Sequence, residues 1–336
     1  MASPNNPKAN NSTEESQHPT NKNNPSRDYR EGKGGGRSTF TSTKASAHFR
    51  PRPTDVLLVT YPKSGTTWLK ALALSLTGRS KHHDYYASSH PLLAGSPHDS
   101  VPFLEFSALG NPTNPNPDLP LMATHIPYSS LPRSVSETKC RIVYLLRDPK
   151  DVVVSLWHFT SKHRSKELPP VSLEEAFELF CQGVSPQGPF WDHALGYWKA
   201  SLEYPERVLV LKYEELKKEP FVSVKRLAEF LGCLFTSQEE KEGGVHKVIE
   251  FCSFEKLSNL EVKKTGKTFG GAVESSVFFR KGEVGDSVNH LTPEMIERID
   301  QITKRWLHGE FPLSSSIFIM ILLLLKVNLA NMRVEF

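Results

Sequence analysis

Between about residues 49 and 307, short apolar runs alternate with segments whose apolar positions recur at helical spacing. Three runs are apolar at successive positions rather than at alternate ones, as strands buried on both faces are. They are Val56 to Tyr61, Arg141 to Leu146 and Val208 to Tyr213. A helical segment follows each run, and this alternation predicts an α/β fold in which helices flank a central parallel sheet. We expect one domain over residues 47–308.

Capping residues mark where the predicted helices begin. A helix from about Thr67 to Leu76 follows the first strand, and Asp148 as N-cap with Pro149 as first helical residue begins the helix after the second. Behind the third strand, one apolar stripe ends at a glycine: Phe221, Val224, Ala228, Leu231 and then Gly232. Two further starts are Ser172 with Glu175, and Thr292 with Pro293.

Both ends of the chain differ in composition from its middle. Residues 1–46 are dominated by Asn, Ser, Thr, Pro, Gly and Lys, which predicts a disordered low-complexity tail. Residues 309–336 form an atypical apolar extension, whose run Ile317 to Leu325 is too short to cross a bilayer as a helix. The N-terminus has no apolar stretch of signal-peptide length, so we expect a cytoplasmic protein, with a transit peptide left open.

The bulk composition excludes several classes of partner. Lys and Arg number 41 against 37 Asp and Glu, and a net charge of +4 over 336 residues predicts no nucleic-acid or membrane partner. The four cysteines are widely spaced, which predicts neither a disulfide framework nor a zinc site. Any anion site must therefore come from local clustering.

One such cluster follows the first predicted strand directly. Lys63, Ser64, Gly65, Thr66 and Thr67 occupy a strand-to-helix turn, where unpaired backbone N–H groups and the helix dipole attract anions. The glycine lets the backbone approach a phosphate, and the lysine supplies a full charge. The lysine precedes the glycine, unlike in the Walker loop, which disfavours an ATP–magnesium site. A hydroxyl-rich turn with a solvated lysine is the alternative.

A second cationic position follows the second strand. Arg147 lies at its carboxyl end, where ligands of open α/β sheets bind. Ser155 is seven residues beyond Asp148, so both lie on nearly one azimuth of the helix and the serine hydroxyl can face the same crevice. From residue types alone, Arg147 and Asp148 could equally be a surface charge pair.

These segments, in this order, resemble the cytosolic sulfotransferase family, in its plant type. The matching motifs are Tyr61 to Trp68, Thr124 to Pro127, Arg147 to Ser155 and Phe279 to Asp286. The resemblance implies a P-loop-NTPase-like sulfotransferase fold and the donor 3'-phosphoadenosine 5'-phosphosulfate (PAPS), with no metal. It assigns the 5'-phosphosulfate to the loop, including Trp68, and the 3'-phosphate to Arg147, Ser155, Arg280, Lys281 and Gly282. It assigns the adenosine half to Tyr213, Ser253 and Phe254.

The resemblance also supplies the catalytic assignments. His125 follows an apolar run and is implied to be the general base that takes the proton of the attacking hydroxyl. Lys63 and the loop amides are implied to stabilise the charge that develops on the oxygen between sulfur and phosphorus. Phe103 is implied to line the pocket of a small organic hydroxyl acceptor, such as a flavonoid or a steroid-like hormone.

The sequence departs from the family pattern at three places, and two other functions remain as alternatives. The low-complexity tail replaces an aromatic segment, Ser287 replaces a tryptophan, and the apolar C-terminal extension is unusual. Val288 and Pro293 break the family's dimerisation motif, so we expect a monomer or a weak dimer. The alternatives are a nucleotide kinase, which shares a phosphate loop, and a non-catalytic nucleotide-binding protein.

Overall fold

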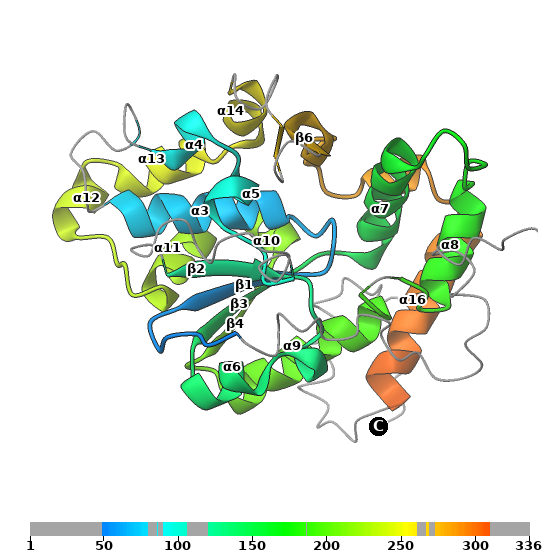
Figure 1. Cartoon of the computed structure of the whole chain (residues 1–336), viewed down its shortest axis with the longest axis horizontal. Coiled ribbons are helices and arrows are strands. Elements are labelled where there is room, and N and C mark those ends of the chain that lie inside the picture. The colour runs from blue at the N-terminus through cyan, green and yellow to red at the C-terminus, as the bar shows by residue number, and fades with distance from the viewer. Residues whose placement is uncertain are drawn as a thin grey trace, which may run out of the picture. The chain divides into compact units, whose positions relative to one another are not determined.

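A four-stranded parallel sheet lies at the centre of the computed structural model (Figure 1). The structure describes residues 49–79, 86, 90–105, 120–185, 187–260, 267–268 and 273–309, all of which belong to one compact unit. The strands are β1 (Val56–Thr60), β2 (Leu121–Thr124), β3 (Arg141–Leu146) and β4 (Val208–Lys212). Their order in the sheet is β2-β1-β3-β4, so β1 pairs with β2 on one side and with β3 on the other.

The sheet is buried on both faces, as the continuous apolar runs predict. Val56 and Leu58 of β1 enter one hydrophobic cluster, while Leu57 and Val59 enter a second cluster on the opposite face. Figure 1 shows helices on both sides of the sheet. The first cluster includes residues of α3 (Thr66–Gly78), α11 (Pro220–Phe230), α13 (Gly244–Phe251) and α14 (Phe254–Asn259). The second includes residues of α6 (Arg133–Thr138), α7 (Pro149–His163), α8 (Leu173–Cys181), α9 (Phe190–Glu203) and α16 (Pro293–Gly309).

The capping residues begin helices where the sequence predicts. Asp148 accepts a hydrogen bond from the Lys150 amide at the start of α7, and Ser172 accepts one from the Glu175 amide at the start of α8. At the start of α16 the hydroxyl of Thr292 accepts one from the amide of Met295. Helix α3 begins at Thr66, within one residue of the predicted position. The α/β fold with a central parallel sheet is thus confirmed.

Two local predictions are wrong. Tyr213 does not end the third predicted strand but begins α10 (Tyr213–Lys218), and its ring lies over the guanidinium of Arg147. Phe221 does not share the buried face of Val224 and Ala228 on α11. It lies one residue after the first residue of that helix, 40% exposed, and its ring contacts His246 instead.

Short elements complete the described chain, and an isolated bridge adds one residue beside β2 at the edge of the sheet. Phe103 forms a single parallel bridge to Ala123, with the Leu104 amide 2.8 Å from the Ala123 carbonyl. This bridge holds the segment after α5 (Pro97–Ser100) against β2. The other short elements are α4 (Pro91–Ala94), η4 (Tyr128–Ser130), α12 (Ser237–Lys241), β5 (Lys267–Thr268), β6 (Val273–Glu274), η5 (Ser275–Phe278) and η6 (Asp286–Asn289).

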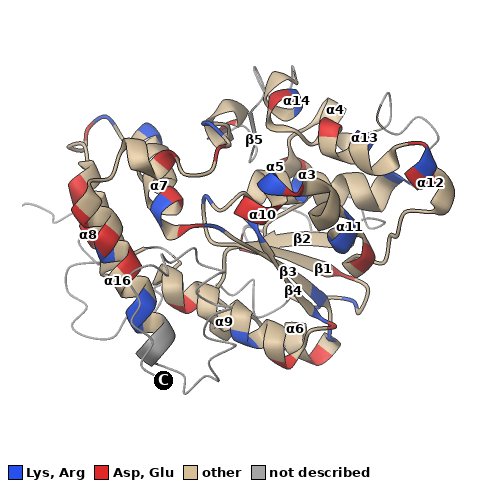
Figure 2. Cartoon of the chain, turned by 180° about the vertical axis from the view of Figure 1, so that it is seen from behind, with Lys and Arg blue, Asp and Glu red and all other residues tan. Residues whose placement is uncertain are grey.

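The tail over residues 1–46 and the run Ile317 to Leu325 lie outside the described residues. Within the described part, no helix has the length and apolar character needed to cross a membrane. Basic and acidic residues occur together on the same helices, for example α7 and α12, as Figure 2 shows. All four cysteines are described, and all are free thiols.

Candidate active site

A cavity of about 960 Å³ opens where the parallel strands end. Because parallel strands present their carboxyl ends at one edge, the residues after β1, β2, β3 and β4 converge there. Of the predicted site residues, the cavity is lined by all but Ser64. They are Lys63, Gly65, Thr66, Thr67, Trp68, Phe103, His125, Arg147, Ser155, Tyr213, Ser253, Phe254, Arg280, Lys281 and Gly282.

The loop after β1 has an unusual backbone. Lys63 has φ 68° and Gly65 has φ 103°, both in the left-handed region. A Cβ atom on Gly65 would lie 2.8 Å from Cδ2 of Tyr213, so only glycine fits there. Ser64 points away from the cavity, and its buried hydroxyl has no hydrogen-bond partner among the described residues. The predicted contact of the Ser64 hydroxyl with the donor is therefore not supported, although its amide remains part of the loop.

Lys63 places its ammonium group among aromatic rings and other cations. Its Nζ lies 4.2 Å from the ring centroid of Phe159 and 5.8 Å from that of Phe278. Burial, followed by the charges of Arg147 and Arg280, lowers the pKa of Lys63 to about 8. The group is thus a cation that an incoming anion would strongly stabilise.

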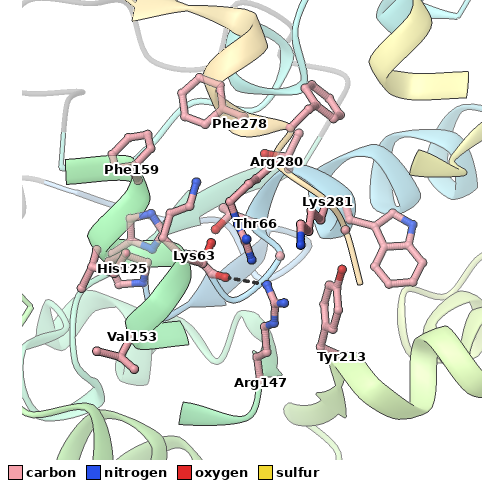
Figure 3. A pocket seen from close by; sticks show the side chains of 18 of the residues that line it. Lys63, Thr66, His125, Arg147, Val153, Phe159, Tyr213, Phe278, Arg280 and Lys281 are labelled. Atoms are coloured by element: carbon pink, nitrogen blue, oxygen red, sulfur yellow. Dashed lines mark hydrogen bonds between the residues drawn. The ribbon is translucent and has the colours of Figure 1, made fainter. Parts of the chain in front are cut away.

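Arg147 points into the site toward Lys63, to which a dashed line joins it (Figure 3). Its guanidinium lies 4.3 Å from the Tyr213 ring and donates to the carbonyl oxygens of Lys63 (3.2 Å) and Glu283 (2.8 Å). Its Nε is buried without a hydrogen-bond partner among the described residues. Ser155, further along the chain in α7, is 6% exposed and lines the same cavity. Arg147 is therefore part of the site and not half of a surface pair with Asp148.

Two buried carboxylates hold the segment that carries Arg280 and Lys281. Asp151, on α7, accepts hydrogen bonds from the amides of Gly285 (2.8 Å) and Ser287 (3.0 Å). Asp286 is ion-paired with both Arg280 and Lys281. Burial would raise the pKa of Asp286, but the hydrogen bonds from Lys281 and Arg280 outweigh it and hold that pKa well below its usual range.

The far end of the cavity has flat apolar walls. The rings of Trp68 and Tyr213 meet edge to face at 5.4 Å, and Phe254 lies against Gly282. A Cβ on Gly282 would clash with Cδ2 of Phe254, and the φ of Gly282 is 67°. Ser253 caps α14 by accepting from the amide of Lys256, at the same end of the cavity.

His125 is held by its Nδ1 atom. That atom lies 2.7 Å from the carbonyl oxygen of Thr60, which can only accept, so Nδ1 carries the proton and Nε2 has a free lone pair. Burial lowers the pKa of His125 to about 4, against the Thr60 hydrogen bond, which raises it. The backbone amide of His125 donates to the buried carboxylate of Glu105. The ring is therefore neutral near pH 7 and able to accept a proton at Nε2.

Sequence reasoning missed several residues of this site. Phe159 and Phe278 line the cavity beside Lys63, while Asp151 and Asp286 fix the second basic segment. The acidic residue three positions after Asp148 carried a signal, since a charge on the buried face of α7 requires a partner. Among the described residues no group of three or more His, Cys, Asp or Glu could hold a metal ion.

A cationic loop, two arginines and a neutral histidine at one edge of a parallel sheet are the arrangement of an α/β enzyme that transfers an anionic group. Comparisons with known proteins agree. The model of the family described as Sulfotransferase domain matches residues 53–311. The chain belongs to the sulfotransferase family, and it is an enzyme of that type.

Its relatives include named plant enzymes. Cytosolic sulfotransferase 1 of Arabidopsis thaliana is 49% identical over 271 residues, which cover 78% of this chain and 81% of that protein. Flavonol 4'-sulfotransferase of Flaveria chlorifolia is 48% identical over 260 residues, covering 77% and 80%. A solved mouse sulfotransferase in complex with PAP (adenosine 3',5'-bisphosphate) is also similar, with a TM-score of 0.62 and 25% sequence identity. The match covers 86% of this chain and 96% of that one. The family assignment favours a sulfotransferase over the nucleotide kinase and the non-catalytic binding protein.

Proposed function

We propose that this chain transfers the sulfuryl group of PAPS to a hydroxyl of a small organic acceptor, with His125 as general base. The observation that carries this proposal is the bond of His125 Nδ1 to the Thr60 carbonyl, which leaves Nε2 free in a cavity that Lys63 also lines. The acceptor oxygen attacks sulfur in line with the departing phosphate, and its proton passes to Nε2.

The nucleotide part of the donor fits the remainder of the cavity. The loop amides, Lys63 and the hydroxyls of Thr66 and Thr67 would hold the 5'-phosphosulfate, because a helix N-terminus with a lysine favours anions. Arg147, Ser155 and the segment Arg280 to Gly282 would hold the 3'-phosphate, and Tyr213, Ser253 and Phe254 the adenosine. Trp68 ends the loop of the 5'-phosphosulfate, and because its ring meets that of Tyr213 it would also contact the adenosine. PAP in a similar solved sulfotransferase supports a donor of this class.

Lys63 would stabilise the charge that develops on the leaving phosphate oxygen. Its lowered pKa reflects burial beside Arg147 and Arg280, which a bound polyanion would offset. The scheme uses no metal.

The acceptor wall is apolar and aromatic. Phe103 lies 4.9 Å from His125 between ring centroids, and Phe159 and Phe278 line the same space. A flavonoid or steroid-like alcohol fits a wall of this kind, and the relative named flavonol 4'-sulfotransferase supports the former. The cytosolic names of the relatives support a cytoplasmic enzyme, and we expect a monomer or a weak dimer.

His125→Ala tests the base. We expect kcat to fall by about 100-fold or more, since general-base catalysis contributes on that scale, while the Kd of adenosine 3',5'-bisphosphate (PAP) stays within about twofold. Turnover should be measured with labelled PAPS over a panel of phenols and alcohols, and binding by calorimetry. Full turnover in His125→Ala would exclude His125 as the base, and a wild-type protein that does not bind PAP would overturn the proposal.

A further inference from the structure

Lys70 is a fully buried lysine that the proposed reaction does not use. It lies on α3 and is 0% exposed. Its Nζ lies 2.8 Å from the carbonyl oxygen of Val101, 3.2 Å from Nδ1 of His98 and 3.4 Å from the ring centroid of Phe103. A buried ammonium needs partners of this kind, since leaving it without them would cost several kcal/mol.

His98 connects this lysine to the phosphate loop. The Nε2 atom of His98 lies 3.1 Å from the hydroxyl oxygen of Thr67, at the start of α3. The His98 ring also stacks on Phe103 at 5.7 Å and tilts against Phe278 at 4.3 Å. The side chains of Lys70, His98 and Thr67 therefore form one hydrogen-bonded chain from the protein interior to the cavity wall.

When Lys70 is charged, the chain has one direction. An ammonium group can only donate, so Nδ1 of His98 must accept from Lys70 and the imidazole proton must be on Nε2. That proton is then donated to the oxygen of Thr67. The Thr67 proton must point elsewhere, and the described hydrogen bonds offer it no protein acceptor, while Thr67 itself lines the cavity.

We propose that Lys70 and His98 are positioning residues, which turn the Thr67 hydroxyl proton into the cavity so that it meets the 5'-phosphate end of the donor. This inference rests on the proposed function, because it takes the loop of Lys63 to Thr67 as the site of that phosphate. The same two residues fix Phe103 beside His125, so one buried group orders both sides of the reacting centre.

The surroundings of Lys70 act on its charge in both directions. Burial lowers the pKa of Lys70 well below its usual value, and the charges of Glu105 and Asp99 act in the opposite direction. The face of the Phe103 ring carries negative potential and favours a cation at 3.4 Å.

The test compares two nucleotides that differ in one group. PAP carries the 5'-phosphate, and adenosine 3'-monophosphate lacks it. In Lys70→Met, which keeps the length of the side chain without its charge, we expect the Kd of PAP to rise about tenfold and that of adenosine 3'-monophosphate to stay within about twofold. Lys225→Met, on the exposed side of α11, is the matched control and should change neither.

A pair of substitutions at His98 separates direction from mere bulk. The amide nitrogen of His98→Gln can replace Nε2–H as the donor to Thr67, whereas His98→Asn is too short to reach it. We expect PAP affinity within about threefold of wild type for His98→Gln and about tenfold weaker for His98→Asn. In a Thr67→Val background, Lys70→Met and His98→Asn should have no further effect on PAP binding.

The outcomes are distinct. If wild type does not bind PAP, both the proposed function and this inference are overturned. If wild type binds PAP but Lys70→Met and His98→Asn bind it equally well, the inference alone is overturned. Equal weakening of both nucleotides, with a lower melting temperature, would assign Lys70 a purely structural role and also contradict the inference.

Discussion

Burial lowers the pKa of both His125 and Lys63. This favours the role of His125 as a base and limits the role of Lys63 as a cation. Burial keeps His125 neutral and hence able to act as a base, with a pKa of about 4. Burial also lowers the pKa of Lys63 to about 8, so in mildly alkaline solution Lys63 is uncharged in a substantial fraction of the molecules. The two residues therefore define a pH range in which the free enzyme is competent.

The pH dependence of kcat/KM follows from these pKa values. His125 must be deprotonated, so activity falls as pH drops through about 4, and Lys63 must be protonated, so activity falls as pH rises through about 8. In kcat the alkaline limb should move upward, because bound anionic donor raises the pKa of Lys63. Steady-state rates from pH 4 to 10 measure both limbs.

Lys63→Arg is the control for this profile. Since an arginine stays protonated throughout the range, its residual activity should lack the alkaline limb. An acid limb near 6.5 in the wild-type enzyme would show that His125 titrates as an exposed histidine, against its buried position.

At the scale of elements, Asp151 joins α7 to the segment that carries Arg280 and Lys281. Its carboxylate is 1% exposed and accepts from the amides of Gly285 and Ser287. An uncharged amide cannot serve both N–H groups equally well, and replacing a charged acceptor in a buried site costs about 1.5–3 kcal/mol. The placement of the segment with Arg280 and Lys281 thus depends on Asp151, which lies four residues after Arg147.

Asp151→Asn should therefore weaken selectivity for the 3'-phosphate. We expect the Kd of PAP to rise about tenfold or more, while that of AMP, which lacks the 3'-phosphate, changes little. Asp300→Asn, which removes one of the two carboxylate partners of Lys150, is the control. If Asp151→Asn weakened AMP to the same degree, the carboxylate would be needed for the whole fold and not for this contact.

Elements with a local signal could be predicted from the sequence, and those set by distant contacts could not. Continuous apolar runs gave three strands, and Asp148 with Pro149 gave the start of α7, because capping and burial on both faces leave a direct trace. The turn of the chain into α10 at Tyr213 left none, since the ring packs on Arg147, a residue distant in the sequence.

The candidate site shows the same division. The residues that motif resemblance assigned to the site line the cavity, except Ser64, whose hydroxyl is buried, but the resemblance missed Phe159 and Phe278, which also line it. Lys70 and His98 were missed because a lysine in a helix normally lies in solvent, and its burial here arises from the segment of residues 98–105 folding over α3. Such contacts join residues about 30 positions apart, which periodicity does not reveal.

At the scale of the whole molecule, the strand order explains where the cavity lies. The chain passes from β1 to β2 on one side of the sheet and then to β3 on the other side of β1. Loops that leave adjacent strands in opposite directions open a crevice at their carboxyl ends. Lys63 follows β1 and Arg147 follows β3, and the 3.2 Å hydrogen bond between them lies at this point.

The predicted domain boundary can be tested by truncation. Since the composition of residues 1–46 offers almost no apolar surface to bury, we expect a protein that starts at residue 47 to keep the melting temperature within about 2 °C and PAP affinity within about twofold. A protein that starts at residue 59 lacks three of the five residues of β1 and should not fold. If the protein that starts at residue 47 lost PAP binding, part of the site would lie within residues 1–46.

The left-handed backbone at Lys63 implies a conflict between durability and turnover at one position. A side chain with a Cβ atom is disfavoured there by about 1 kcal/mol, a strain that glycine does not suffer. Lys63→Gly and Lys63→Ala both remove the ammonium group, yet the glycine variant should resist heat and urea better than the alanine variant by about that amount. Both should be poor catalysts, because both lack the ammonium group. A substitution that stabilises the protein at this turn would therefore lower its activity.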